Sequence, residues 1–166
     1  EPDESAMNAE IAFLIFPDTS ASVVYGMLDL VASAGRDWPL IVDGVPGQQL
    51  IATRVVAREA GSVVVGNGVP VLASASLADC PPVEVICVPE VNLPPGTPLA
   101  ERFAPEIAWL RQRFDAGATL TTACSGAMLL AEAGLLAGCE ATTHWAWCDV
   151  LARDYPTVKV QGQRAL

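Results

Sequence analysis

Thr119-Leu-Thr-Thr-Ala-Cys-Ser-Gly-Ala-Met128 is typical of a buried strand that turns sharply at Cys124 into a helix. A cysteine at such a corner lies at the helix N-terminus, where the helix dipole favours the thiolate over the thiol. The free backbone N–H groups of the first turn, starting with that of Ser125, are expected to face the sulfur. Gly126 fits the same geometry, because a small residue lets the first helical turn pass close to the strand.

The residues that follow this corner favour a functional cysteine over a cysteine that only packs, which is how most free cysteines behave. His144 is the only histidine of the chain and lies 20 residues beyond Cys124. Between them, residues 128–136 are apolar at helical spacing and Ala137-Gly138 ends that helix. One helix and one short strand can therefore return the imidazole of His144 to the sheet edge that carries Cys124.

Composition limits the classes of protein to which the chain can belong. Its 166 residues are 52% hydrophobic, which suits one well-buried domain. We find neither the roughly 18 consecutive apolar residues of a membrane span nor a secretory signal. Five cysteines without a CxxC pair indicate a reducing cytoplasm. The net charge of −10, with nine basic residues, argues against nucleic-acid binding by this chain alone.

The hydrophobic pattern alternates strands with helices. The expected strands are residues 9–16, 38–43, 83–89 and 118–123, with short strands at 141–143 and 158–160. The expected helices are residues 21–35, 105–117, 125–136 and 145–154. Residues 50–72 are Val-rich and predict a β-hairpin or short edge strands, with a turn at Gly66-Asn67-Gly68.

Most of these strands are continuous apolar runs, which indicates a mainly parallel sheet covered by helices on both faces. The fold class is therefore α/β, a three-layer sandwich with the cysteine at a strand-to-helix elbow. Ligands of such sheets bind at the carboxyl ends of the strands, where both Pro89 and Cys124 lie. We expect residues 1–8 to be a disordered or artificially added lead and residues 9–166 to be a single domain.

Five motifs carry a family resemblance. They are Ile11-Ala-Phe-Leu-Ile-Phe-Pro17, Val85-Ile-Cys-Val-Pro89, Thr122-Ala-Cys-Ser-Gly126, Leu129-Leu-Ala-Glu-Ala-Gly-Leu-Leu136 and Ala141-Thr-Thr-His-Trp145. Together they resemble the ThiJ/PfpI superfamily, which has the flavodoxin-like, class I glutamine amidotransferase-like fold. Residues 124–145 are similar to the N-terminal domains of GlxA-type regulators of the AraC family, whose C-terminal half is a helix-turn-helix module. The resemblance implies that this chain lacks the family's last strand and helix and that DNA-binding module.

The resemblance makes Cys124 the nucleophile-like cysteine and His144 its catalytic-like neighbour. It places an anion-binding pair at the backbone N–H groups of Ser125 and near Val91. The ligand-binding residues that it implies are Glu90, Val91, Cys124, Ser125, His144 and Trp145.

Two departures from the family pattern bear on activity. Val23 occupies the position where enzymes of the superfamily often carry an acidic residue. Pro89-Glu-Val-Asn92 replaces the usual Pro-Gly-Gly, which restricts the backbone and puts the carboxylate of Glu90 near the thiol. Both departures favour a pocket that binds a ligand over a site that turns it over.

We therefore expect a domain that senses an unknown small metabolite, forms a homodimer and contacts DNA only through a helix-turn-helix module absent from this chain. One alternative is a cysteine-dependent enzyme acting on a small substrate, either an amidase-like hydrolase or an isocyanide hydratase. Another is a redox or stress protein in which Cys124 is oxidised. We expect no cofactor, no membrane contact and no metal, because His144 and Cys148 share a helix face without further ligands.

Overall fold

The structure is a computed structural model that describes residues 9–164. The predicted lead at residues 1–8 lies outside this range. Among the described residues, no helix has the length and apolar character that crossing a membrane requires.

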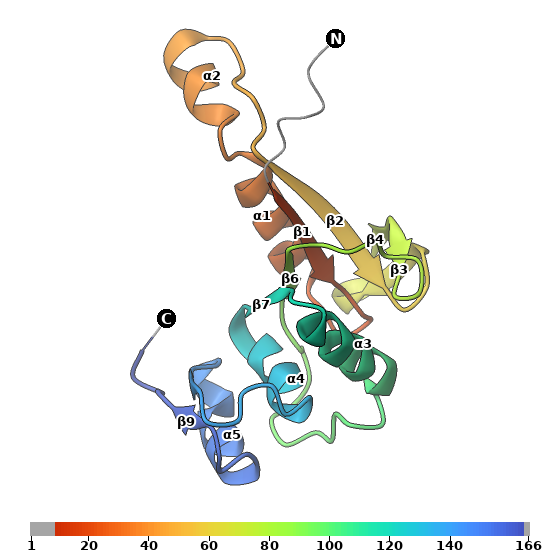
Figure 1. Cartoon of the computed structure of the whole chain (residues 1–166), viewed down its shortest axis with the longest axis vertical. Helices are drawn as coiled ribbons and strands as arrows, with labels where there is room; N and C mark the ends of the chain where they lie inside the picture. Colours follow the sequence, from red (N-terminus) through yellow and green to blue (C-terminus); the bar gives the residue numbers. More distant parts are fainter. Residues whose placement is uncertain (1–8, 165–166) are drawn as a thin grey trace.

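A five-stranded sheet forms the centre of the domain (Figure 1). Its strands are β1 (Ala9–Leu14), β2 (Ile51–Ala57), β5 (Ala75–Ser76), β6 (Val85–Val88) and β7 (Thr119–Thr122), in the spatial order β5-β2-β1-β6-β7. Every pairing in this sheet is parallel, which confirms the prediction of a mainly parallel sheet. The sequence is continuously apolar from Ile11 to Phe16 because, from Ala12 onward, side chains on both faces of the sheet are buried.

One face of the sheet is covered by α1 (Ala21–Ala32) and by a hairpin of β3 (Gly61–Val65) and β4 (Val69–Ala73). Ile15, Val24, Val55 and Val71 belong to the buried cluster on this side. At the hairpin turn, Asn67 has a positive φ of 60° within a short 3₁₀ helix (Gly66–Gly68), so the predicted turn at these residues is confirmed.

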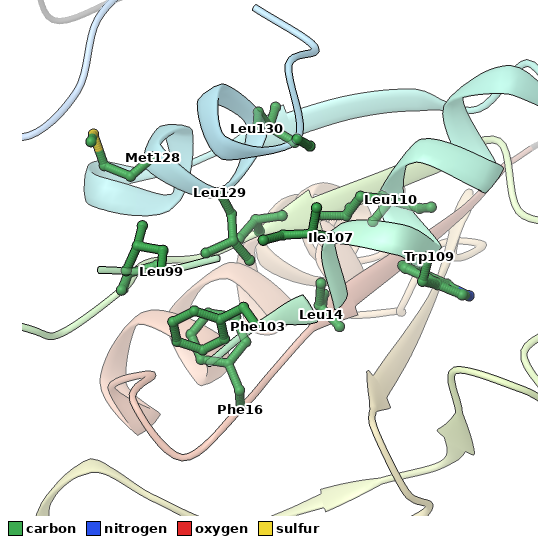
Figure 2. Close-up of a cluster of buried hydrophobic side chains, with 14 of the residues drawn as sticks. Leu14, Phe16, Leu99, Phe103, Ile107, Trp109, Leu110, Met128, Leu129 and Leu130 are labelled. Atoms are coloured by element: carbon green, nitrogen blue, oxygen red, sulfur yellow. The ribbon is translucent and has the colours of Figure 1, made fainter. Parts of the chain in front are cut away.

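The opposite face packs against α3 (Ala104–Asp115) and α4 (Ala127–Glu132). Figure 2 shows Leu129 above Ile107 and the ring of Phe103 against Phe16, with the two ring centroids 4.7 Å apart. Phe16, Phe103 and Leu129 are each at most 3% exposed. Helices on one face, and a helix with a hairpin on the other, give the predicted three-layer α/β architecture of the flavodoxin-like class.

Residues 38–43 are not the strand that their apolar content predicts. They form the helix α2 (Asp37–Asp43), which projects beyond the sheet at one end of the molecule (Figure 1). The helix dipole favours the carboxylate of Asp37 in the first turn, where Pro39 is also tolerated. Gly44 ends the helix in the left-handed conformation, with a φ of 72°. No residue of α2 is buried, so an apolar run here does not mark a core strand.

Two strands differ from their predicted environment. β2 is an inner strand of the sheet, paired with both β1 and β5, although residues 50–72 suggested only a hairpin or edge strands. β7 was expected to be buried, but it is the last strand of the sheet and alternates between exposed and partly buried residues. Its Thr-Leu-Thr-Thr sequence fits that position, because one edge of the strand meets solvent.

The C-terminal part forms a small unit beside α4. β8 (Glu140–Ala141) pairs in parallel with β9 (Lys159–Val160) as a separate two-stranded sheet. Between them lie a 3₁₀ helix (Trp145–Trp147) and α5 (Cys148–Asp154), which packs through the fully buried Leu151. The two short strands predicted at 141–143 and 158–160 therefore form, displaced by one or two residues and outside the central sheet.

Candidate functional site

Cys124 lies at the corner between β7 and a 3₁₀ helix (Cys124–Gly126) that continues into α4. Its φ is +52°, one of two positive values among the described non-glycine residues, and its side chain is exposed. A left-handed backbone conformation costs most L-residues about 1–3 kcal/mol, and it persists only where the surrounding structure imposes it. The predicted strand-to-helix elbow is thus present, with its thiol accessible to solvent.

Gly126 explains how this corner is held. A Cβ atom built on Gly126 would lie 2.2 Å from the backbone oxygen of Val88, at the end of β6. No side chain can replace the hydrogen there without moving the backbone of either segment. The first turn after Cys124 therefore passes directly against β6, whereas the sequence predicted a close approach to the strand that the turn has just left.

The hydroxyl group of Ser125 joins the corner to the loop after β6. Its Oγ donates to the backbone oxygen of Val91 at 2.8 Å and accepts from the backbone N–H of Val91 at 3.0 Å. Ser125 and Val91 are both buried. The N–H of Val91 is therefore bound to Ser125 Oγ and is not a free donor for an anion in this structure.

Glu90 is held by the loop after β1. Its Oε1 accepts from the backbone N–H of Ser20 at 3.0 Å, directly before α1 begins. A carboxylate is favoured at this place, because the amide groups at a helix N-terminus carry partial positive charge. The backbone N–H of Asn92 donates to the oxygen of Asp18 at 2.7 Å. The loops after β1 and β6 are thereby fixed to each other beside the Cys124 corner.

The chain returns the segment of His144 to the corner, as its spacing predicted. Thr143 Oγ1 donates to the backbone oxygen of Cys124 at 3.2 Å. Cys148 Sγ lies 3.8 Å from the oxygen of His144, within the next turn. The loops that carry Cys124 and His144 are therefore neighbours, linked through a threonine whose role the sequence did not reveal.

The imidazole ring of His144 has a defined hydrogen-bonding role. Its Nδ1 accepts from the backbone N–H of Ala146 at 3.2 Å and caps the short helix that begins at Trp145. A nitrogen that accepts a hydrogen bond carries no proton, so the neutral ring has its proton on Nε2. Nε2 can then donate a hydrogen bond to a ligand, but it has no lone pair with which to take the proton of a thiol.

Trp145 presents an aromatic surface beside this ring. Its side chain is 80% exposed, and its ring centroid lies 5.2 Å from that of His144. Within residues 9–164, no carboxylate hydrogen-bonds to the His144 ring. The group that would orient a catalytic imidazole in a nucleophile–base–acid arrangement is thus absent from the described residues.

A separate cavity of about 410 Å³ lies at the carboxyl ends of β1 and β2, with α3 as one wall. Cys124 is not one of its lining residues, which are Ile15, Phe16, Pro17, Asp18, Ala57, Arg58, Glu59, Ala60, Ser62, Val63, Arg102, Phe103 and Glu106. The sequence gives one signal of this cavity, Arg58, a cation directly after the buried end of β2.

Two ion pairs line this cavity. Arg58 Nη2 lies 2.8 Å from Glu106 Oε2, and Arg102 binds both carboxylate oxygens of Asp18 at 2.7 Å. Glu106 is 1% exposed, whereas the side chains of both arginines are about half exposed. The hydrogen bond to Glu106 raises the pKa of the Arg58 guanidinium above its ordinary value. Because each cation already has its own carboxylate, the cavity offers little net attraction for an anion.

A metal site does not form among residues 9–164, where no three His, Cys, Asp or Glu side chains gather closely enough to hold an ion. His144 and Cys148 are neighbours along one segment without a further ligand. A small molecule could bind at the Cys124 corner, in the cavity beside β2, or in a second cavity of about 410 Å³ whose lining includes Met128, Trp147 and Tyr155.

Comparison with known proteins gives this arrangement a context. A family model described as the DJ-1/PfpI family matches residues 44–164. Isonitrile hydratase of Pseudomonas putida is 29% identical over 147 residues, which cover 87% of this chain and 56% of that protein. The HTH-type transcriptional regulator CdhR of Pseudomonas aeruginosa is 29% identical over 154 residues, which cover 93% of this chain and 42% of that protein. The chain thus spans about half the length of these curated relatives or less.

Among solved structures, an AraC family transcriptional regulator from Pseudomonas putida superimposes with a TM-score of 0.71. The match covers 92% of this chain and 76% of that one at 19% sequence identity, so it speaks for the fold alone.

Proposed function

Because this chain belongs to the DJ-1/PfpI family, we propose that it is the ligand-sensing and dimerisation domain of an AraC-family transcriptional regulator. In this proposal an unidentified small metabolite binds at the Cys124 corner, two copies associate, and DNA is contacted by a helix-turn-helix module outside this chain. The protein would act in the cytoplasm. The match to an HTH-type regulator, of which this chain spans 42%, supports a place within a longer DNA-binding protein.

The observation that carries the proposal is the hydrogen bond from the Ala146 N–H to His144 Nδ1. It leaves Nε2 as a donor, so the imidazole can hold an oxygen of a ligand, whereas taking the proton of Cys124 through Nε2 would require the other tautomer and the loss of the Ala146 bond. A sensor requires a donor of this kind and an accessible aromatic surface such as that of Trp145. It requires neither a general base nor a group that carries the proton away.

The second candidate is an enzyme that acts through the Cys124 thiol. The exposed side chain and left-handed backbone of Cys124 favour it, as does the 29% identity to an isonitrile hydratase. Such an enzyme would need a group to take the thiol proton and return it to the product. His144 is the only histidine, and its hydrogen bonding opposes this role.

Incubating the chain with an aryl isonitrile and quantifying the formamide by chromatography separates the two candidates. We expect formation at the rate of the buffer alone for the wild type and for Cys124→Ala alike. Formamide production that is lost in Cys124→Ala would contradict the sensor proposal and establish the enzyme.

Ligand binding itself is tested by thermal unfolding with a panel of small carboxylic acids and amides, which offer an acceptor oxygen to His144 Nε2. A ligand at 100 times its Kd stabilises the folded state by about 2.7 kcal/mol. We expect at least one compound to raise the Tm of the wild type but not that of His144→Ala. A panel without effect, or an equal rise in both proteins, would contradict binding at this corner.

The regulator assignment also predicts the sequence that follows in the gene. The reading frame that encodes this chain should continue into a basic, helical DNA-binding module. A frame without such a module would contradict the assignment, whatever the ligand experiments show.

A further inference from the structure

Residues 35–50 leave α1, form α2 and return to β2, and we call them the α2 arm. The arm projects away from the three layers of the domain (Figure 1). Its large apolar side chains lie in solvent: Trp38 is 74% exposed, Ile41 77%, Val45 64% and Val42 59%. No residue of α2 is buried against any other described part of the chain. Isolated apolar side chains are ordinary on a surface, but a contiguous group of this size indicates an interaction site.

The arm is rigidly built rather than loosely attached. Its two legs are joined by hydrogen bonds from the Gly47 N–H to the Arg36 oxygen at 2.9 Å and from the Leu50 N–H to the Ala34 oxygen at 3.1 Å. A Cβ atom on Gly47 would lie 2.2 Å from the Gly35 oxygen. Such close packing at the base holds α2 in one position, so binding there would order little additional chain.

The charge of the arm suits contact between two identical chains. The whole chain carries a net charge of −10, so two copies repel each other over most of their surfaces. The arm contains only Arg36, Asp37 and Asp43 as charged residues, and Arg36 and Asp37 form an ion pair at 2.6 Å. Its apolar face is therefore the place where two copies can approach with the least repulsion.

The exposed area matches what a dimer needs. Leu40 and Leu50 add to the four side chains above, at 45% and 41% exposure, and Leu30 in the last turn of α1 is 73% exposed. With typical side-chain areas, these residues expose on the order of 700 Å², close to the roughly 800 Å² that each partner buries in a specific complex. A two-fold contact uses the same patch on both copies, so each copy would cover apolar side chains of the other.

We propose that the α2 arm is the surface through which two copies of this chain associate, arm against arm. This inference rests on the proposed function in so far as that function requires a dimer, and it names the surface that forms the dimer. The site at Cys124 and the arm lie on different elements, so ligand binding at the corner and association through the arm can fail separately, whereas a monomeric chain would also contradict the dimerisation in the proposed function.

Sedimentation velocity at micromolar concentration tests the proposal with two matched variants. Ile41→Glu places a charge on the arm, and Leu72→Glu places one on β4, where the side chain is similarly exposed at 70%. We expect the wild type and Leu72→Glu to sediment with twice the chain mass of 17.4 kDa. For Ile41→Glu we expect a single chain, with a dimer Kd raised about 30-fold or more, as for a central interface residue.

A monomeric wild type would overturn the proposal, as would a dimeric Ile41→Glu. A monomeric Leu72→Glu beside a dimeric Ile41→Glu would assign the interface to the hairpin instead. Far-UV circular dichroism checks that each variant is folded. Trp38→Ser provides a second substitution on the arm, one that adds no charge. The isonitrile assay and the ligand panel report on the proposed function separately, so a failure of the arm is not confused with a failure of the site.

Discussion

The Cys124 corner and the α2 arm are held in place in the same way but leave opposite kinds of surface uncovered. In each, a glycine approaches a backbone oxygen so closely that a Cβ atom would lie 2.2 Å from it, at Gly126 in the corner and Gly47 in the arm. In the corner, the polar groups of Glu90, Val91 and Ser125 bind one another or the adjacent loop. In the arm, the polar groups bind within the arm and its base, while the apolar side chains remain unpacked.

The difference indicates what each region can bind. The corner leaves a thiol, an N–H donor and an indole ring accessible, which suits a small molecule. The arm leaves a large apolar surface with little charge, which suits another protein surface. Close backbone contacts hold both regions in place. Substitutions at Gly126 and Gly47 should therefore separate the contribution of the corner to stability from that of the arm to association.

The largest effect is expected from Gly126→Ala. Its new Cβ would meet the Val88 oxygen, a backbone atom that cannot turn aside, so we expect a loss of about 2–4 kcal/mol in the free energy of unfolding. Urea denaturation measures this loss. Gly26→Ala is the control, because its Cβ meets nothing within 4 Å and alanine favours α1 by about 0.5–1 kcal/mol. Equal denaturation midpoints for the two variants would contradict the account of the corner.

Gly47→Ala should act on association rather than on the domain. The added Cβ separates the legs of the arm, so we expect a rise in the dimer Kd of about tenfold or more, equal to about 1.4 kcal/mol. Sedimentation measures the Kd. Gly44→Asn is the control, since nothing lies within 4 Å of a Cβ there and asparagine tolerates the left-handed conformation. If both variants dimerise like the wild type, the rigid arm has no part in association.

The exposed Cys124 contrasts with Cys87 on β6, which is buried. Burial raises the pKa of the Cys87 thiol above its ordinary value, while a hydrogen bond with Thr121 opposes this shift. Above about pH 8.5 the unfolded chain therefore loses a proton that the folded chain retains, so stability falls as pH rises. The slope is at most about 1.4 kcal/mol per pH unit for one thiol. We expect denaturation of Cys87→Ala between pH 8 and 10 to show a shallower slope, and an unchanged slope would refute this cause.

Much of the fold could be predicted from the sequence, because the inner strands are buried and therefore consist mainly of apolar residues. Residues 11–16 and 85–89 are apolar without interruption, and they contain most of β1 and all of β6 near the centre of the sheet. The same signal misled at residues 38–43, where Trp-Pro-Leu-Ile-Val lies on the surface in α2 rather than in the core. A pattern of hydrophobicity shows that a segment avoids water, but not whether its own chain or another surface covers it.

The site was predicted in outline from Cys124, Gly126 and the spacing to His144. Its bonding could not be predicted, because it depends on which atoms meet when separate loops converge. Thr143 links the loops that carry Cys124 and His144. The N–H of Val91, which the family resemblance assigned to an anion, donates instead to Ser125 Oγ. The proton position on His144 likewise depends on one backbone bond from Ala146.

The central claim is that His144 does not take the proton of Cys124. Its most direct test is the rate of iodoacetamide alkylation at Cys124 against pH, followed by mass spectrometry in the wild type and in His144→Ala. We predict that the two profiles coincide within about twofold, with the same midpoint. A wild-type thiol that reacts at neutral pH about tenfold or more faster than in the variant would show proton transfer to the imidazole, and would contradict the claim.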